Sequence, residues 1–185
     1  MLRKFVVLAA MALVACTPPI DRLAMPRLQS ELSLSPLVSS AMVRTVILPT
    51  YAELEEVAFE TPSGLIAIDE NVLWADMPDR AVTLNIAQSL ADILDTRVGP
   101  DPWPFVGLPD IAIDIRVARM LAGADGVFRL TGQYYIGGDG IDFPNSTRAF
   151  EITQPMPDQS LQSIAAAQSA ALLTLSEQIA RSLGR

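Results

Sequence analysis

The feature that most constrains the fold is an extended apolar segment that turns directly into an amphipathic helix. Residues 69–95 read DENVLWADMPDRAVTLNIAQSLADILD, and the extended part breaks at Asp76-Met77-Pro78. Asp76 can cap the free amides of the helix, Pro78 occupies the first turn, where an N–H is not needed, and Asp79 favours the positive helix end. This segment predicts a strand followed by a helix over residues 78–95 that docks on a sheet.

Two segments have the one-sided apolar pattern of surface helices, so each must bury one face. In the first, residues 78–95, the stripe consists of Val82, Ile86, Leu90, Ile93 and Leu94. In the second, which begins at Pro157 or Asp158 and ends at Leu183, it consists of Leu161, Ala165, Leu172, Leu175, Ile179 and Leu183. The alanines of the second helix allow close approach to a neighbour.

The remaining apolar segments are short and predict strands. The clearest is 111–119, where Ile111, Ile113, Ile115 and Val117 alternate with polar residues, and it should pair antiparallel with 127–136 across the Asp125-Gly126 turn. Further strands are expected at 43–49, 56–60, 65–69 and 146–153, whereas the proline-rich segment 99–104 should be a loop. We therefore predict a two-layer α+β fold, with two amphipathic helices on one face of an antiparallel or mixed sheet.

The first sixteen residues have the pattern of a secretory signal. Arg3 and Lys4 precede an apolar run over 5–15, which is too short to span a hydrocarbon core of about 30 Å. Leu13-Val14-Ala15-Cys16 resembles the bacterial lipobox, in which the cysteine is lipidated and becomes the first mature residue. The resemblance implies an anchor at Cys16, and Thr17 after the cysteine implies sorting to the outer membrane.

These patterns predict a signal peptide over 1–15, a lipidated cysteine and flexible tether over 16–42, and a single α+β domain over 43–185. The tether prediction rests on scattered prolines and serines. An alternative is that part of this segment packs across the domain through Leu32, Leu34 and Leu37. For Cys16 the alternative is a buried, unmodified cysteine.

The composition excludes several classes of function. The net charge is −8 and Lys4 is the single lysine, so neither nucleic acid nor a polybasic contact with anionic lipid is expected. The chain has no histidine and one cysteine, which disfavours triads, zinc sites and disulfides. No nucleotide-binding or nucleophile-elbow motif occurs. We expect no catalytic residues, no cofactor and no metal.

Two carboxylate groupings have simpler explanations than chemistry. Asp139, Asp142 and Asn145 lack the spacing and the bidentate glutamate of a calcium loop, so a solvated turn is preferred. Asp76 and Asp79 are accounted for by a helix start. The candidate partner-contact residues are Trp74 and Trp103, because aromatic side chains often anchor interfaces. Core packing is the alternative for both.

The elements together resemble the auxiliary lipoproteins of ABC-type transport systems, a family that includes the paraquat-inducible lipoprotein. The resemblance rests on the lipobox, on a strand ending in Leu48-Pro49, and on the N-x-x-W-A-x-x-P pattern formed by Asn71, Trp74, Ala75 and Pro78 ahead of the amphipathic helix. Position 73, often basic in such sequences, is Leu73 here.

The resemblance implies a non-enzymatic accessory subunit on the periplasmic face of the outer membrane, and it allows for a homo-oligomer. Its implied partners are an MCE-domain protein and an ABC permease and ATPase, which together move lipids or maintain membrane integrity. Two alternatives remain: an outer-membrane assembly or structural lipoprotein, and a periplasmic lipid-binding carrier. A carrier should have an apolar cavity between its sheet and helices.

Overall fold

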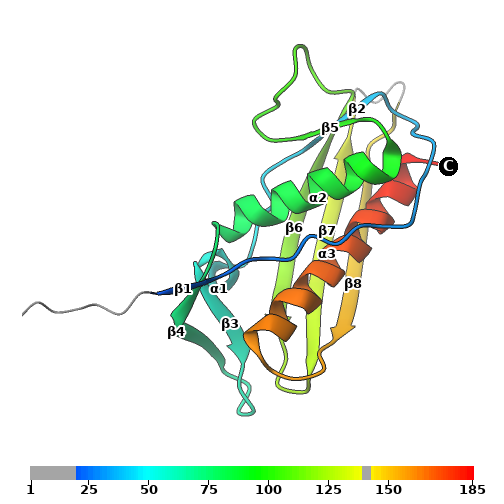
Figure 1. The fold of residues 1–185 in the computed structure, drawn as a ribbon. Coiled ribbons are helices and arrows are strands. Elements are labelled where there is room, and N and C mark those ends of the chain that lie inside the picture. Colours follow the sequence, from blue (N-terminus) through cyan, green and yellow to red (C-terminus); the bar gives the residue numbers. More distant parts are fainter. Residues whose placement is uncertain (1–19, 139–142) are drawn as a thin grey trace, which may run out of the picture.

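In the described part of the chain, residues 20–138 and 143–185 of a computed structural model, eight strands form one open mixed sheet (Figure 1). Two long helices lie side by side on one face of this sheet, which confirms the predicted two-layer α+β class. The elements are β1 (Asp21–Leu23), β2 (Ser40–Val43), α1 (Thr50–Glu53), β3 (Glu56–Glu60), β4 (Ile66–Trp74), α2 (Pro78–Leu94), β5 (Arg97–Pro100), β6 (Ile111–Ala122), β7 (Val127–Gly137), β8 (Ser146–Pro155) and α3 (Leu161–Leu183).

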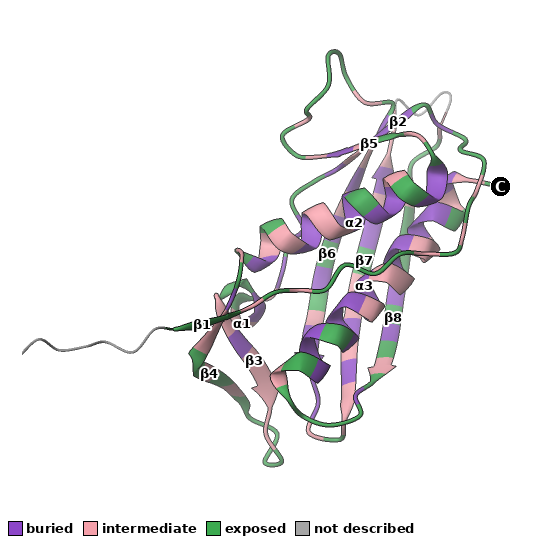
Figure 2. Cartoon of the chain, viewed as in Figure 1, coloured by how far each residue is buried: buried purple, intermediate pink, exposed green. Residues whose placement is uncertain are grey.

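The longest strands, β6, β7 and β8, form the antiparallel meander that the alternating pattern predicts. These strands carry many buried residues, drawn in purple in Figure 2. They include Ile113, Ile115, Phe128, Leu130, Tyr134, Ile136, Phe150 and Ile152. The register shifts between Val117 and Arg119, so β6 contains an irregularity in its middle.

Gly132 of β7 faces this irregularity and has no room for a side chain. A Cβ there would lie 2.2 Å from the Arg116 carbonyl oxygen and 2.7 Å from the ring of Phe150. We therefore expect Gly132→Ala to lower the free energy of unfolding by about 1–3 kcal/mol, and the melting temperature by about 2–4 °C for each kcal/mol.

Gly137→Ala is the matched control in the same strand, because its Cβ would find its nearest neighbour 3.7 Å away, at Asn145. Thermal denaturation of the two variants should show a lower melting temperature for Gly132→Ala alone. Equal melting temperatures would contradict the close approach of β6 and β7.

The other half of the sheet differs from prediction between residues 40 and 49. Strand β2 comes earlier than the expected strand 43–49, and lies parallel to β5 and β6. After β2, the backbone of residues 44–47 makes only intermittent hydrogen bonds with β6. One of them is donated by the Ile47 amide to the Ile115 carbonyl at 3.0 Å. The ladder breaks because the Val46 amide donates instead to Thr83 Oγ1 of α2 at 2.9 Å.

Helix α2 begins at Pro78 as predicted, but Asp76 is not its cap. Met77 occupies the cap position without a side-chain bond to the helix amides. The Asp76 carboxylate accepts a hydrogen bond from the Met77 amide and pairs with Arg80. The structural role of Asp76 is therefore an ion pair across the first turn.

Helix α3 begins at Leu161, later than the expected start at 157 or 158. Ser160 caps it, because the Ser160 hydroxyl accepts a hydrogen bond from the Ser163 amide at 3.2 Å. Hydrogen bonds from Ser160 and Ser163 hold the pKa of Asp158 at about 2. Residues 157–160 thus form a hydrogen-bonded turn ahead of the helix.

The tether expected over residues 16–42 is wrong for residues 21–42, which belong to the folded unit. Strand β1 pairs parallel with β4, and the chain then crosses the outer side of the two long helices (Figure 1). The Leu34 amide donates to the Ile93 carbonyl at 2.9 Å, and the Leu37 amide donates to the Leu183 carbonyl at 2.8 Å. Of the three leucines named in the alternative interpretation, Leu32 and Leu34 pack against the core, whereas Leu37 is 47% exposed.

Candidate interaction sites

Trp74 lies at the junction between β4 and α2, and the structure places it in the core. Its side chain is buried, with 7% of the residue exposed. Its backbone amide donates to the Glu55 carbonyl at 2.6 Å, and its carbonyl accepts a bond from the Arg22 guanidinium at 3.0 Å. The next amide, of Ala75, donates to the Leu23 carbonyl at 2.9 Å. The junction therefore holds the first described strand in place.

A shallow groove of about 300 Å³ lies next to this junction, between the N-terminal segment and α2. It is lined by Trp74, by residues 23–25 and Arg27, and by residues of α2 that include Ala81, Leu84 and Gln88. Its volume is at the lower end of the range for ligand sites, about 300–1,000 Å³. The buried position of the indole means that a partner would reach Trp74 only along this groove.

Trp103 lies in the loop 101–110 that connects β5 to β6, and this loop presents apolar side chains to solvent. The indole is half-buried against Phe105, with ring centroids 4.9 Å apart and an edge-on angle of 62°. Beyond it, Val106 is fully exposed and Leu108 is 91% exposed. The loop is therefore an apolar projection with an aromatic base.

Both ends of loop 101–110 are fixed to the sheet. The Asp101 amide donates to the Val43 carbonyl at 2.9 Å. The Asp110 carboxylate accepts bonds from the Ser39 and Ser40 amides at 2.8 and 3.0 Å. Near its start the loop folds back so closely that a Cβ on Gly99 would lie 2.8 Å from the Pro104 ring. The tip is thus held on a defined base.

The structure does not bring the two tryptophans together, because Trp74 ends β4 whereas Trp103 lies in the loop after β5, and these two strands are far apart in the strand order (Figure 1). Of the two, only Trp103 is part of an exposed apolar surface. Cys16, the predicted lipidation site, lies outside the described residues. Sequence reasoning selected Trp103 but missed Val106 and Leu108, which the apolar, proline-punctuated run from 102 to 109 could have indicated.

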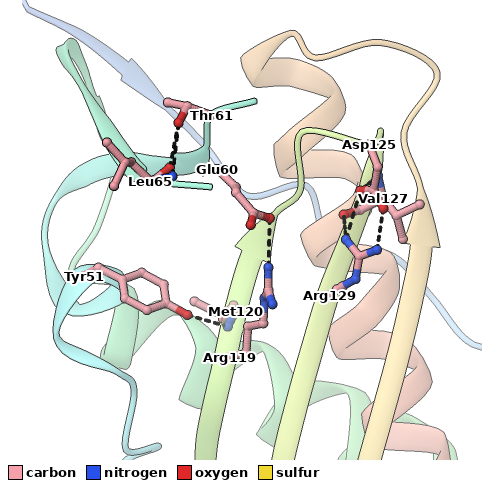
Figure 3. A network of polar contacts seen from close by, with 9 residues as sticks. All are labelled: Tyr51, Glu60, Thr61, Leu65, Arg119, Met120, Asp125, Val127 and Arg129. Carbon is pink, nitrogen blue, oxygen red and sulfur yellow. Dashed lines mark hydrogen bonds and ion pairs between the residues drawn. The ribbon is translucent and has the colours of Figure 1, made fainter. Parts of the chain in front are cut away.

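A polar cluster joins the ends of β3, β6 and β7 (Figure 3). Glu60 pairs with Arg119 at 2.8 Å, and Asp125 pairs with Arg129. The hydrogen bond from Arg129 and its charge hold the pKa of Asp125 at about 2. The Met120 amide also donates to the Tyr51 hydroxyl at 3.2 Å. Since its carboxylates are neutralised by arginines, the cluster fits a structural role better than proton transfer.

A cleft of about 230 Å³ lies between this cluster and the start of α3, lined by residues that include Phe59, Glu60, Met156 and Ile164. Within residues 20–138 and 143–185, no group of three His, Cys, Asp or Glu side chains is arranged to hold a metal ion. Asp139 and Asp142 lie outside the described residues, whereas Asn145 accepts a bond from the Gly138 amide at 3.2 Å. In the same described ranges, no helix is long and apolar enough to cross a bilayer.

The fold and these surfaces define a small α+β protein with an exposed apolar loop. The chain belongs to the family described as the ABC-type transport auxiliary lipoprotein component, whose model matches residues 26–180. The suspected family is therefore confirmed, and the matched residues include the Trp74 junction but not the lipobox at 13–16. A comparison with curated protein sequences finds no match.

Solved structures share the fold. A crystal structure of an uncharacterized protein is 18% identical, with a TM-score of 0.70, and the match covers 88% of this chain and 98% of the other. A protein from Xanthomonas campestris with the designation DUF330 is 14% identical, with a TM-score of 0.60, and the match covers 87% of this chain and 90% of the other. At these identities the similarity concerns the fold alone.

Proposed function

We propose that the chain is a non-catalytic accessory subunit of an MCE-type lipid transport system, anchored through Cys16 to the periplasmic face of the outer membrane. Its family is that of lipoproteins auxiliary to ABC-type transport. In this proposal the transporter's own permease and ATPase supply the energy, and the MCE-domain protein spans the distance between membranes. The chain provides a folded unit fixed to the receiving or donating membrane.

The observation that carries the proposal is the family match over residues 26–180, which covers nearly all of the folded unit. Two features of the structure support it. The charged groups of the polar cluster are paired with one another rather than arranged around a reacting centre. The chain is bound to the fold from β1 onward, first by pairing with β4 and then by hydrogen bonds to the ends of α2 and α3. Few residues therefore separate the described fold from Cys16.

The carrier alternative receives less support from the packing. Side chains fill the space between sheet and helices, where Ile113, Leu172 and Leu175 are fully buried. The groove beside Trp74 and the cleft at α3, about 300 and 230 Å³, lie at the edges of this core. Neither has the form of an acyl-chain cavity between the two layers, which a carrier would require.

Affinity capture from detergent-solubilised membranes tests the proposed partnership. With the full-length chain tagged after Arg185, we expect an MCE-domain protein, a permease and an ATPase to co-purify. Val106→Asp/Leu108→Asp serves as a second bait that asks whether the exposed loop is needed. Recovery of outer-membrane assembly components without an MCE protein would refute the transport proposal and favour the assembly alternative.

A further inference from the structure

The loop 101–110 is the most exposed apolar feature among the described residues, and the proposed function does not yet use it. Its tip consists of Phe105, Val106, Gly107 and Leu108, with Gly107 at φ +89°. This left-handed backbone angle suits glycine and makes a tight turn that directs its two neighbours outward. The turn accordingly leaves Val106 and Leu108 almost wholly in water.

The chemistry of the loop fits a lipid bilayer better than a protein groove. Residues 102–109 carry no charge, and three of them, Pro102, Pro104 and Pro109, have no backbone N–H. Backbone donors that enter lipid without a partner are costly, so their removal favours insertion. The half-buried Trp103 stands behind the tip, and tryptophan prefers the membrane interface.

The charges near the loop limit how deeply it can insert and which lipids it can enter. Asp101 and Asp110 flank the apolar run, and Asp110 is held at the sheet by two amides. These carboxylates should remain at the headgroup level while the tip enters the first several ångströms of the acyl region. Because the whole chain has a net charge of −8, neutral phospholipids should accept the loop better than anionic ones.

The short connection to Cys16 keeps the domain near the membrane. Four residue steps separate Cys16 from Ile20, which gives a reach of about 14 Å when fully extended. Strand β1 and strand β5 stand at the two ends of the strand order β1-β4-β3-β6-β2-β5, so the loop that follows β5 lies well away from β1 (Figure 1). Contact of both regions with one surface would fix the orientation of the domain.

We propose that loop 101–110 is a second membrane contact. It inserts Phe105, Val106 and Leu108 into the same bilayer to which the chain is anchored through Cys16. The inference rests on the proposed function for the anchor at Cys16. The insertion orients the domain on the membrane rather than holding it there. The covalent lipid supplies the attachment, and the loop removes the freedom to swing about it.

The two tryptophans of the chain provide a direct readout. The protein purified from membranes is reconstituted into phosphatidylcholine vesicles whose acyl chains carry bromine, which quenches indole fluorescence on contact. We expect quenching of Trp103 in the wild type and loss of that quenching in Val106→Asp/Leu108→Asp. The variant Trp103→Phe isolates Trp74, whose buried indole should not be quenched.

Leu65→Asp is the matched control, because Leu65 is 68% exposed on the turn between β3 and β4, away from the loop. It should keep full quenching, and both Leu65→Asp and Val106→Asp/Leu108→Asp should keep the wild-type melting temperature because their changed side chains lie largely in solvent. No quenching of wild-type Trp103 in vesicle-bound protein would overturn the proposal. Loss of captured partners without any quenching would instead assign the loop to a protein contact.

Vesicle flotation separates this proposal from the anchor itself. If the purified chain does not float, the lipid anchor is absent and the proposed attachment fails. Cys16, the one cysteine of the chain, is then coupled to a maleimide phospholipid so that the domain is tethered at the same residue. The quenching experiment on this tethered protein still decides whether the loop inserts.

Discussion

Replacement of Cys16 by alanine is expected to move the chain from the membrane fraction to the soluble fraction or to the wrong membrane. Each buried CH₂ of an acyl chain contributes about 0.8 kcal/mol, so the several chains of a lipidated cysteine give stable attachment. The apolar run over 5–15 is too short to replace them as a spanning helix. Density-gradient fractionation with detection of the chain measures the change.

Thr17→Ala is the neighbouring control, since it retains the cysteine and the small residue before it. It should remain membrane-bound, and an intact mass should show acyl chains on Cys16 in this variant and in the wild type. A Cys16→Ala chain that is still firmly attached to the outer membrane would contradict the lipid anchor. Attachment would then have to come from other parts of the chain.

Trp74→Ala is expected to destabilise the fold by about 3–5 kcal/mol, which is the usual cost of truncating a large buried aromatic side chain. Trp74 is a buried core residue on β4, next to β1 and shortly before α2 begins. The groove already present beside it favours the lower end of that range, because the site is partly open. Chemical denaturation of the wild type and the variant gives the difference in unfolding free energy.

Trp103→Ala provides the comparison for a half-buried tryptophan in a loop. We expect it to change stability far less than Trp74→Ala, because its ring packs mainly on Phe105 rather than in the core. If Trp74→Ala left the melting temperature unchanged but abolished partner capture, Trp74 would be a contact residue rather than a core residue. That result would reverse the role assigned to the junction.

Much of the fold followed from periodicity. The stripes of α2 and α3 and the alternation in β6 identified their buried faces, because each pattern repeats over enough residues to exceed local noise. The β6–β7 hairpin followed from the Asp125-Gly126 turn, where Gly126 has a φ of +79°. The sequence therefore predicts best those long helices and strands that bury one face.

The structure of residues 20–49 is predicted less well by their sequence, for a physical reason. Prolines and serines made 16–42 resemble a tether, yet its leucines pack on the helices and its amides bond to the helix ends. Similarly, 43–49 has the composition of a strand, but the Val46 amide bonds to Thr83 from a distant helix. Such contacts depend on the assembled core and leave no local pattern.

The candidate sites show the same division. Composition could select Trp74 and Trp103 but could not say which was buried, since both follow apolar or proline residues. The structure separates them by placing Trp74 in the core, on the strand paired with β1, and Trp103 behind an exposed tip. The Glu60–Arg119 ion pair joins β3 to β6, and the Asp125–Arg129 pair joins the β6–β7 turn to β7; neither belongs to a sequence motif.

An ATP-dependent lipid transfer experiment tests the proposed transport role most directly. One set of vesicles contains the ABC–MCE transporter, a second contains the lipid-anchored chain, and a fluorescent phospholipid reports exchange between them. We expect transfer to fall when the chain is omitted or when Cys16→Ala protein is added in solution, and to be kept by Leu65→Asp. Transfer that is unchanged without the chain would contradict an auxiliary role in lipid transport.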